Sequence, residues 1–99
     1  MDKFVKVQAK TSANMKMIES RYGLDGFAIA LKICQMAKSE ENNCKWNEDK
    51  MKKFLSDYGI SERRINLVRQ VVNYCAELGV ISKELYKKNI ISVDDEKGI

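Results

Sequence analysis

Arginine and amide side chains recur along one side of a predicted helix between Gly59 and Gly79. Their chemistry suits base recognition, because arginine hydrogen-bonds the edge of guanine, and Asn or Gln the edge of adenine, in a DNA major groove. The candidates for base contacts are Arg63, Asn66, Gln70 and Asn73. The sequence therefore predicts a polar helix face that reads bases, provided that the opposite face is buried.

The same segment carries the signals of one amphipathic helix. Ser61 can cap its start, because a serine oxygen accepts a hydrogen bond from a free N–H of the first turn. Gly79 suits the left-handed residue that ends a helix. Apolar residues recur at helical spacing and mark the buried side: Ile65, Val68, Val71, Val72, Cys75 and Leu78. We expect the arginine and amide side to face solvent.

Positive charge on this helix has no local partner. None of its arginines has an acid three or four residues away, the spacing at which helical side chains meet. We predict that a set of cations lies near DNA phosphates: Arg64, Arg69, Lys83, Lys87 and Lys88. The alternative is that the arginines cover apolar surface with their stems, or pair with acids distant in sequence.

The preceding helix differs, because its acids stand four residues before its lysines in the favourable order. The expected pairs are Glu48 with Lys52 and Asp49 with Lys53. Asn47 can cap that helix, and the two acids lie in the first turn, where the helix dipole favours them. We therefore expect the lysines of this helix to form a solvated surface.

Composition sets the class of protein. The chain has 99 residues, 44% hydrophobic and 32% charged, which suits one folded domain with one core. Its net charge of +4 permits a polyanionic partner. No apolar run approaches the roughly 20 residues of a membrane span, and the first residues lack the apolar core of a signal peptide. We expect a cytoplasmic protein with no membrane partner.

The sequence lacks the residues that several classes of chemistry require. Histidine is absent, and the three cysteines, Cys34, Cys44 and Cys75, form no CxxC motif. The sequence therefore predicts no metal site, no His-dependent triad and no disulfide framework. No glycine-rich phosphate loop is present either. We expect neither an enzyme nor a cofactor nor a small-molecule substrate.

The remaining segments predict a mainly α fold with a small β-sheet. Residues 3–9 partly alternate, which indicates a short strand or an extended arm. A helix is expected from Thr11 or Ser12 to Gly23, and a more apolar one from Gly26 to about Ser39. Two short helices joined by the tight turn at Gly59 form a helix-turn-helix pattern.

A small wing is expected to follow that pattern. The β-like segments are 45–47, 80–81 and 90–93. Ser82 can cap a single helical turn between the last two. The order of elements predicts a winged helix-turn-helix fold.

Four stretches carry a resemblance to a known family. They are Tyr22, Gly23, Gly26 and Phe27; Trp46 to Asp49; Gly59 to Ser61; and Glu77 to Tyr86. With these motifs the chain resembles the N-terminal winged-helix domain of DnaD-like phage and bacterial replication initiators, also called replisome organisers. The resemblance covers nearly the whole chain from about Lys3. The base-reading face lies outside the shared pattern.

The resemblance implies a role in initiating DNA replication in a bacterial or phage-infected cell. It implies DNA binding, self-association or contact with a helicase loader. It also implies that residues 1–99 form one winged-helix domain at the N-terminus of a longer protein, with 94–99 as a tail or the start of a linker.

Two other functions share this fold. A protein-interaction module could pair through the arm that holds Phe4, Val5 and Val7, by strand addition. Leu67 and Tyr74, expected to be exposed on the flank of the predicted base-reading helix, would suit such a contact. A winged-helix transcription regulator would use the same chemistry as an initiator at a different DNA site.

Overall fold

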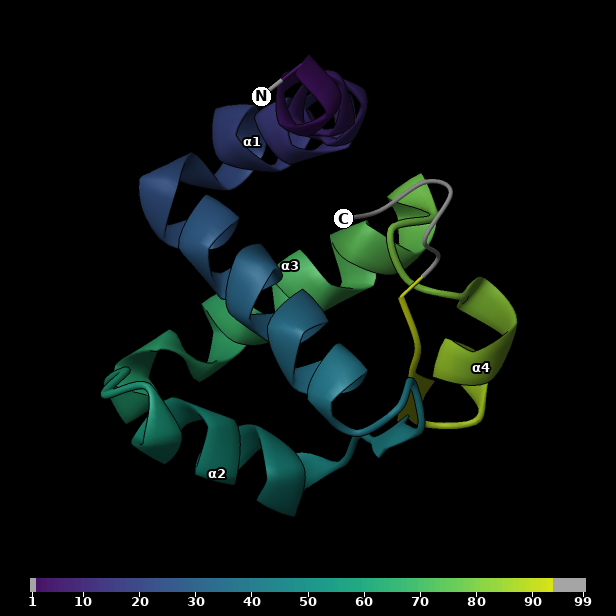
Figure 1. Cartoon of the computed structure of the whole chain (residues 1–99). Coiled ribbons are helices and arrows are strands. Elements are labelled where there is room, and N and C mark those ends of the chain that lie inside the picture. Colours follow the sequence, from purple (N-terminus) through teal and green to yellow (C-terminus); the bar gives the residue numbers. More distant parts are fainter. Residues whose placement is uncertain (1, 94–99) are drawn as a thin grey trace.

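The computed structural model describes residues 2–93, with side chains from Ala13 onward, and the expected tail at 94–99 lies outside these residues. Helices dominate, with one small antiparallel sheet (Figure 1). The elements are α1 (Asp2–Ser39), β1 (Cys44–Lys45), α2 (Glu48–Asp57), a 3₁₀ turn η1 (Glu62–Arg64), α3 (Ile65–Leu78), α4 (Lys83–Lys87) and β2 (Ile90–Ile91). The predicted fold class, mainly α with a small sheet, is confirmed, and the order of elements is compatible with a winged helix.

Helix α1 consists of two helices that meet at Gly23. Gly23 has φ 78° and ψ −172°, a backbone region that is essentially restricted to glycine. The predicted boundary at Gly23 is therefore confirmed. The expectation of a strand or extended arm at 3–9 is wrong, because the backbone there is helical. A helix satisfies its own backbone hydrogen bonds, whereas a lone strand needs a partner edge.

Replacing Gly23 with alanine should destabilise the domain by about 1–3 kcal/mol through its backbone conformation alone. An added Cβ would meet no atom within 4 Å, so no steric clash contributes. The measurement is urea unfolding followed by circular dichroism. The matched control is Leu24→Ala, because Leu24 is 73% exposed and its loss should cost about 0.5 kcal/mol or less. Equal stability of the two variants would contradict the argument.

The core lies where the second half of α1 packs against α3, with α2 closing the lower side in Figure 1. Its fully buried members come from α1, α2, α3 and the two strands and include Ile18, Ile33, Phe54, Val72 and Ile91. The tight turn after α2 is held by a hydrogen bond from the Ile60 N–H to the Leu55 carbonyl, at 2.8 Å. This turn sets α3 across the inner faces of α1 and α2.

The start of the predicted third helix differs in detail. Ser61 caps it as expected, since its Oγ accepts from the Arg63 N–H at 3.3 Å. The first turn is a 3₁₀ turn, however, and regular α-helix begins only at Ile65. Such turns are common at helix starts. Gly79 ends α3 in the left-handed conformation, with φ 80°, as predicted.

The wing forms from the last strand and its neighbours. β1 pairs with β2 in antiparallel register, Cys44 opposite Ile91 and Lys45 opposite Ile90. An isolated bridge joins Ile81 to Val93. Ser82 caps α4 through the Leu85 N–H at 3.3 Å. The predicted helical turn at Ser82 and a small sheet that includes 90–91 are present, which is compatible with a wing, although the first strand covers 44–45 and not 45–47.

Candidate nucleic-acid interface

One side of α3 presents a stripe of polar side chains to solvent. Asn66, Gln70, Asn73 and Glu77 are exposed, at spacings that place them on a single face. The other side is buried, with Val68, Val71, Val72 and Cys75 in the core. The predicted amide face is therefore exposed, and we call these four residues the α3 stripe. Glu77 puts a negative charge at the end where α3 meets the wing.

The expectation that the arginines are uncompensated is wrong for two of them. Arg64 forms an ion pair with Asp25 of α1, and Arg69 forms one with Glu48 of α2. These acids are distant in sequence and reach α3 only because α1 and α2 pack beside it. All four side chains are about half exposed, so such pairs add about 0–1 kcal/mol each to stability. Arg63 is exposed and pairs with no acid in the described part of the chain.

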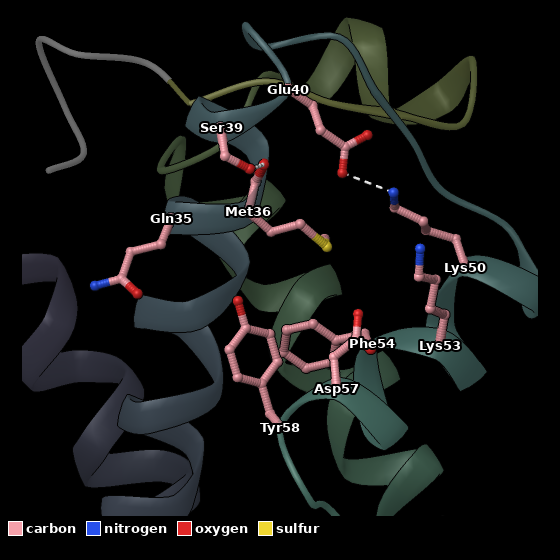
Figure 2. Close-up of a pocket in the computed structure, with 9 residues that line it drawn as sticks. All are labelled: Gln35, Met36, Ser39, Glu40, Lys50, Lys53, Phe54, Asp57 and Tyr58. Carbon is pink, nitrogen blue, oxygen red and sulfur yellow. Dashed lines mark hydrogen bonds and ion pairs between the residues drawn. The ribbon is translucent and has the colours of Figure 1, made fainter.

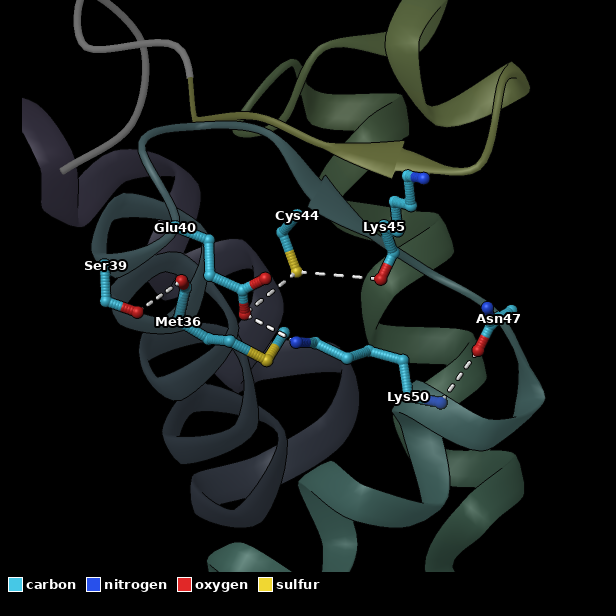
Figure 3. A network of polar contacts seen from close by, with 7 residues as sticks. All are labelled: Met36, Ser39, Glu40, Cys44, Lys45, Asn47 and Lys50. Carbon is cyan, nitrogen blue, oxygen red and sulfur yellow. Dashed lines mark hydrogen bonds and ion pairs between the residues drawn. The ribbon is translucent and has the colours of Figure 1, made fainter.

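Glu48 therefore pairs with Arg69 of α3 and not with a lysine of its own helix. The expected pairs do not form among the residues with described side chains. These were Glu48 with Lys52, and Asp49 with Lys53. Lys50 is the lysine of α2 that pairs, with its Nζ 2.6 Å from Glu40 Oε2 (Figure 3). Lys52 and Lys53 are exposed without a carboxylate partner in this part of the chain. The two predicted ion pairs are therefore wrong, whereas Lys52 and Lys53 are solvated as expected.

Two further contacts fix the borders of the α3 stripe. The Tyr86 hydroxyl donates a hydrogen bond to Asn73 Oδ1, which ties α4 to one edge of the stripe. On the other edge, Arg69 donates to Asn66 Oδ1 at 3.2 Å as well as to Glu48. The stripe thus lies between the wing and the start of α2. Gln70 keeps a side chain without a protein partner within residues 13–93.

Leu67 and Tyr74 are partly buried rather than exposed. The Tyr74 ring lies edge-on to Tyr22 of α1, with 5.7 Å between ring centroids. The Arg21 guanidinium stacks on the same ring at 4.8 Å. These side chains hold α1 to α3, which leaves little of them for the protein contact considered from the sequence.

The wing lysines are the least constrained cations beside the α3 stripe. Lys83, Lys87 and Lys88 are exposed, and within the described residues their side chains form no ion pair or hydrogen bond. Lys45 of β1 has the same properties, and the sequence reasoning missed it. Its signal was weak, because a lysine in a two-residue strand has no periodicity to place it.

The far side of the domain is hollowed between α1 and α2. A pocket of about 370 Å³ lies there, with α3 passing behind it in Figure 2. Its apolar wall comes from Met36, Phe54 and Tyr58, and the Glu40–Lys50 pair stands at its rim. α3 covers the inner side of both helices, so this pocket and the α3 stripe lie on opposite faces.

The three cysteines are buried, as was predicted for Cys75 on the apolar side of α3. Burial raises the pKa of Cys34 and of Cys44 to about 11, and that of Cys75 to about 12. Cys44 also donates to Glu40 Oε2, with 3.7 Å between sulfur and oxygen (Figure 3). A neutral, enclosed thiol is a poor nucleophile.

We expect iodoacetamide at pH 8 to modify these thiols only after urea unfolds the protein. Mass spectrometry of the treated protein checks this, and rapid modification of the native protein would contradict the enclosed geometry.

The raised pKa values also predict a pH effect on stability. The folded state keeps thiol protons that the unfolded state loses near pH 9.0, so this contribution is full below pH 9 and declines as pH rises toward 11. Urea unfolding between pH 7 and 10.5 measures this pH effect.

No described helix has the length and apolar character to cross a membrane. In the same part of the chain, no three potential metal ligands of the His, Cys, Asp or Glu type gather at one place. Comparison with known families gives a match to the family described as Lin1244/Lin1753-like, N-terminal, over residues 5–93. No curated protein and no solved structure shows significant similarity to the chain. The match spans nearly the whole sequence, and the chain therefore belongs to the Lin1244/Lin1753-like N-terminal family.

Proposed function

We propose that this domain binds duplex DNA, with α3 in the major groove and the wing against the backbone. The observation that carries the proposal is the exposed α3 stripe, with the cation Arg63 before its start and the wing lysines near its α4 edge. A major groove about 12 Å wide admits one α-helix. Asn66, Gln70 and Asn73 offer donors and acceptors along that helix, and Arg63 reaches from its first turn.

In this proposal, the wing makes the contacts with the DNA backbone. Lys83, Lys87 and Lys88 have no carboxylate partner among the described residues and are free to meet phosphates. Arg64 and Arg69 are already paired with Asp25 and Glu48. They reach phosphates only by exchanging a carboxylate for a phosphate, which half-exposed pairs permit at low cost.

We further propose that the DNA-binding domain serves the initiation of DNA replication in bacteria or their phages. Support comes from the motifs shared with DnaD-like initiators, such as Trp46 to Asp49 and Glu77 to Tyr86. The proposed relationship to DnaD-like initiators is more specific than the match to the Lin1244/Lin1753-like N-terminal family. In this setting self-association and contact with a helicase loader are further partner proposals.

The test is fluorescence anisotropy with labelled duplex and single-stranded DNA over a salt series. Each phosphate contact contributes about −0.9 to the slope of log affinity against log salt. Contacts by the three wing lysines alone predict a slope of about −2.7, and contacts that include both paired arginines predict about −4.5. No duplex binding at low salt, or binding that salt does not weaken, would contradict the proposal.

A second candidate is self-association through α1, a protein-interaction role. The specific observation is that Met17 and Leu24 of α1 are large apolar side chains that are 47% and 73% exposed. Pairing by strand addition has no support, because the segment that holds Phe4, Val5 and Val7 is helical. Sedimentation equilibrium of wild type and Leu24→Asp tests this candidate. A monomer at high micromolar concentration would remove it.

A further inference from the structure

Lys45 is a cation that the proposed function leaves unused. It stands on β1 between Cys44 and Trp46, both buried, so its side chain is on the outward face of the two-stranded ladder. That side chain is exposed, and its ammonium group forms no ion pair or hydrogen bond within the described part of the chain. In Figure 3 it points toward β2 and away from the Glu40–Lys50 pair.

The ladder brings Lys45 to the end of the wing. It lies directly opposite Ile90, and the next residue, Trp46, donates its N–H to the Asn89 carbonyl at 2.7 Å. Asn89 has φ 62° and turns the chain immediately after Lys88. The segment that holds Lys87 and Lys88 therefore runs beside the segment that holds Lys45.

This cluster also borders the α3 stripe. Lys45 is three residues before Glu48, which pairs with Arg69 at one edge of the stripe. Lys87 follows Tyr86, which bonds to Asn73 at the other edge. The segments that hold these lysines thus adjoin the residues that make the two edge contacts of the stripe. A duplex seated on α3 would bring one sugar-phosphate strand to that position.

We propose that Lys45, with Lys87 and Lys88, holds one phosphate strand of bound DNA. The inference rests on the proposed duplex binding and adds a contact from β1, outside the helix-turn-helix and the α4 turn. Four phosphate contacts, these three lysines and Lys83, predict a salt slope of about −3.6 rather than −2.7. The competing explanation is that the Lys45 stem only covers the half-buried Ile90.

Lys45→Gln separates the two explanations in the salt-series assay. The matched control is Lys53→Gln, because Lys53 is an exposed lysine of the pocket on the opposite face. We expect Lys45→Gln to make the slope less negative by about 0.9, Lys53→Gln to leave it unchanged, and Lys45→Arg to keep the wild-type value. Thermal unfolding followed by circular dichroism checks that each variant is folded.

The outcomes are distinguishable. If wild type fails to bind duplex DNA, the proposed function falls and takes the inference with it. If wild type binds and Lys45→Gln keeps its slope, or matches a lowered slope of Lys53→Gln, the inference about Lys45 is overturned and the proposed function stands. If Lys45→Gln lowers thermal stability alone, its role is to cover Ile90.

Discussion

Phe54→Ala is expected to lower the free energy of unfolding by about 3–5 kcal/mol, the usual cost of removing a buried phenyl ring. Phe54 is a core residue that is 1% exposed and also lines the pocket between α1 and α2. Its ring packs edge-on to Trp46, with 6.2 Å between centroids, and at 4.9 Å from the Tyr58 ring. The total free energy of unfolding of a domain of this size is about 5–15 kcal/mol. The expected loss is therefore a large share of its stability.

Urea unfolding followed by far-ultraviolet circular dichroism measures this loss, because Trp46 fluorescence would change with its own neighbour. Tyr58→Ala is the matched control. Tyr58 shares the contact with Phe54 but is 41% exposed, so its truncation should cost less than half as much. Equal losses for the two variants would contradict the burial assigned to Phe54.

Asn66→Asp combined with Gln70→Glu should abolish duplex binding, with a loss of at least about 100-fold. The substitutions keep the shape of both side chains and place two carboxylates where the proposed interface meets the electronegative duplex. Like charges brought together across an interface cost several kcal/mol. Both positions are exposed, so the fold should persist.

The control pair is Gln35→Glu with Ser39→Asp, which changes the net charge by the same two units. Gln35 and Ser39 are both exposed and line the pocket on the opposite face. We expect this control to weaken binding by less than about threefold, because charges beyond a Debye length of roughly 8–10 Å are screened. Equal losses in both double variants would mean that net charge, and not the α3 stripe, governs binding.

Local signals in the sequence predicted the capping residues of the helices correctly. Ser61, Ser82 and Asn47 each accept the backbone hydrogen bond expected of a cap. Gly79 takes the left-handed conformation that its position at the end of α3 required. These features depend on residues within a few positions of each other, so one sequence is enough to find them.

Long-range contacts were beyond such reasoning. The partners of Arg64 and Arg69 are 39 and 21 residues away, and only the packing of α1 and α2 against α3 brings them close. The same packing leaves Lys52 and Lys53 without the partners that helical spacing suggested. Lys45 joins the wing because of strand register, which two-residue strands do not encode in a pattern. The exposed side of α3 was predictable, whereas its charge balance was not.

The most direct test of DNA binding through α3 is a titration of ¹⁵N-labelled protein with a duplex, followed by backbone and side-chain amide resonances. We predict that the largest shifts fall on Asn66, Gln70 and Asn73, with the lysines of α4 next, while Gln35 and Ser39 in the opposite pocket stay unchanged. Shifts confined to the α1–α2 face, or none at low salt, would contradict the account.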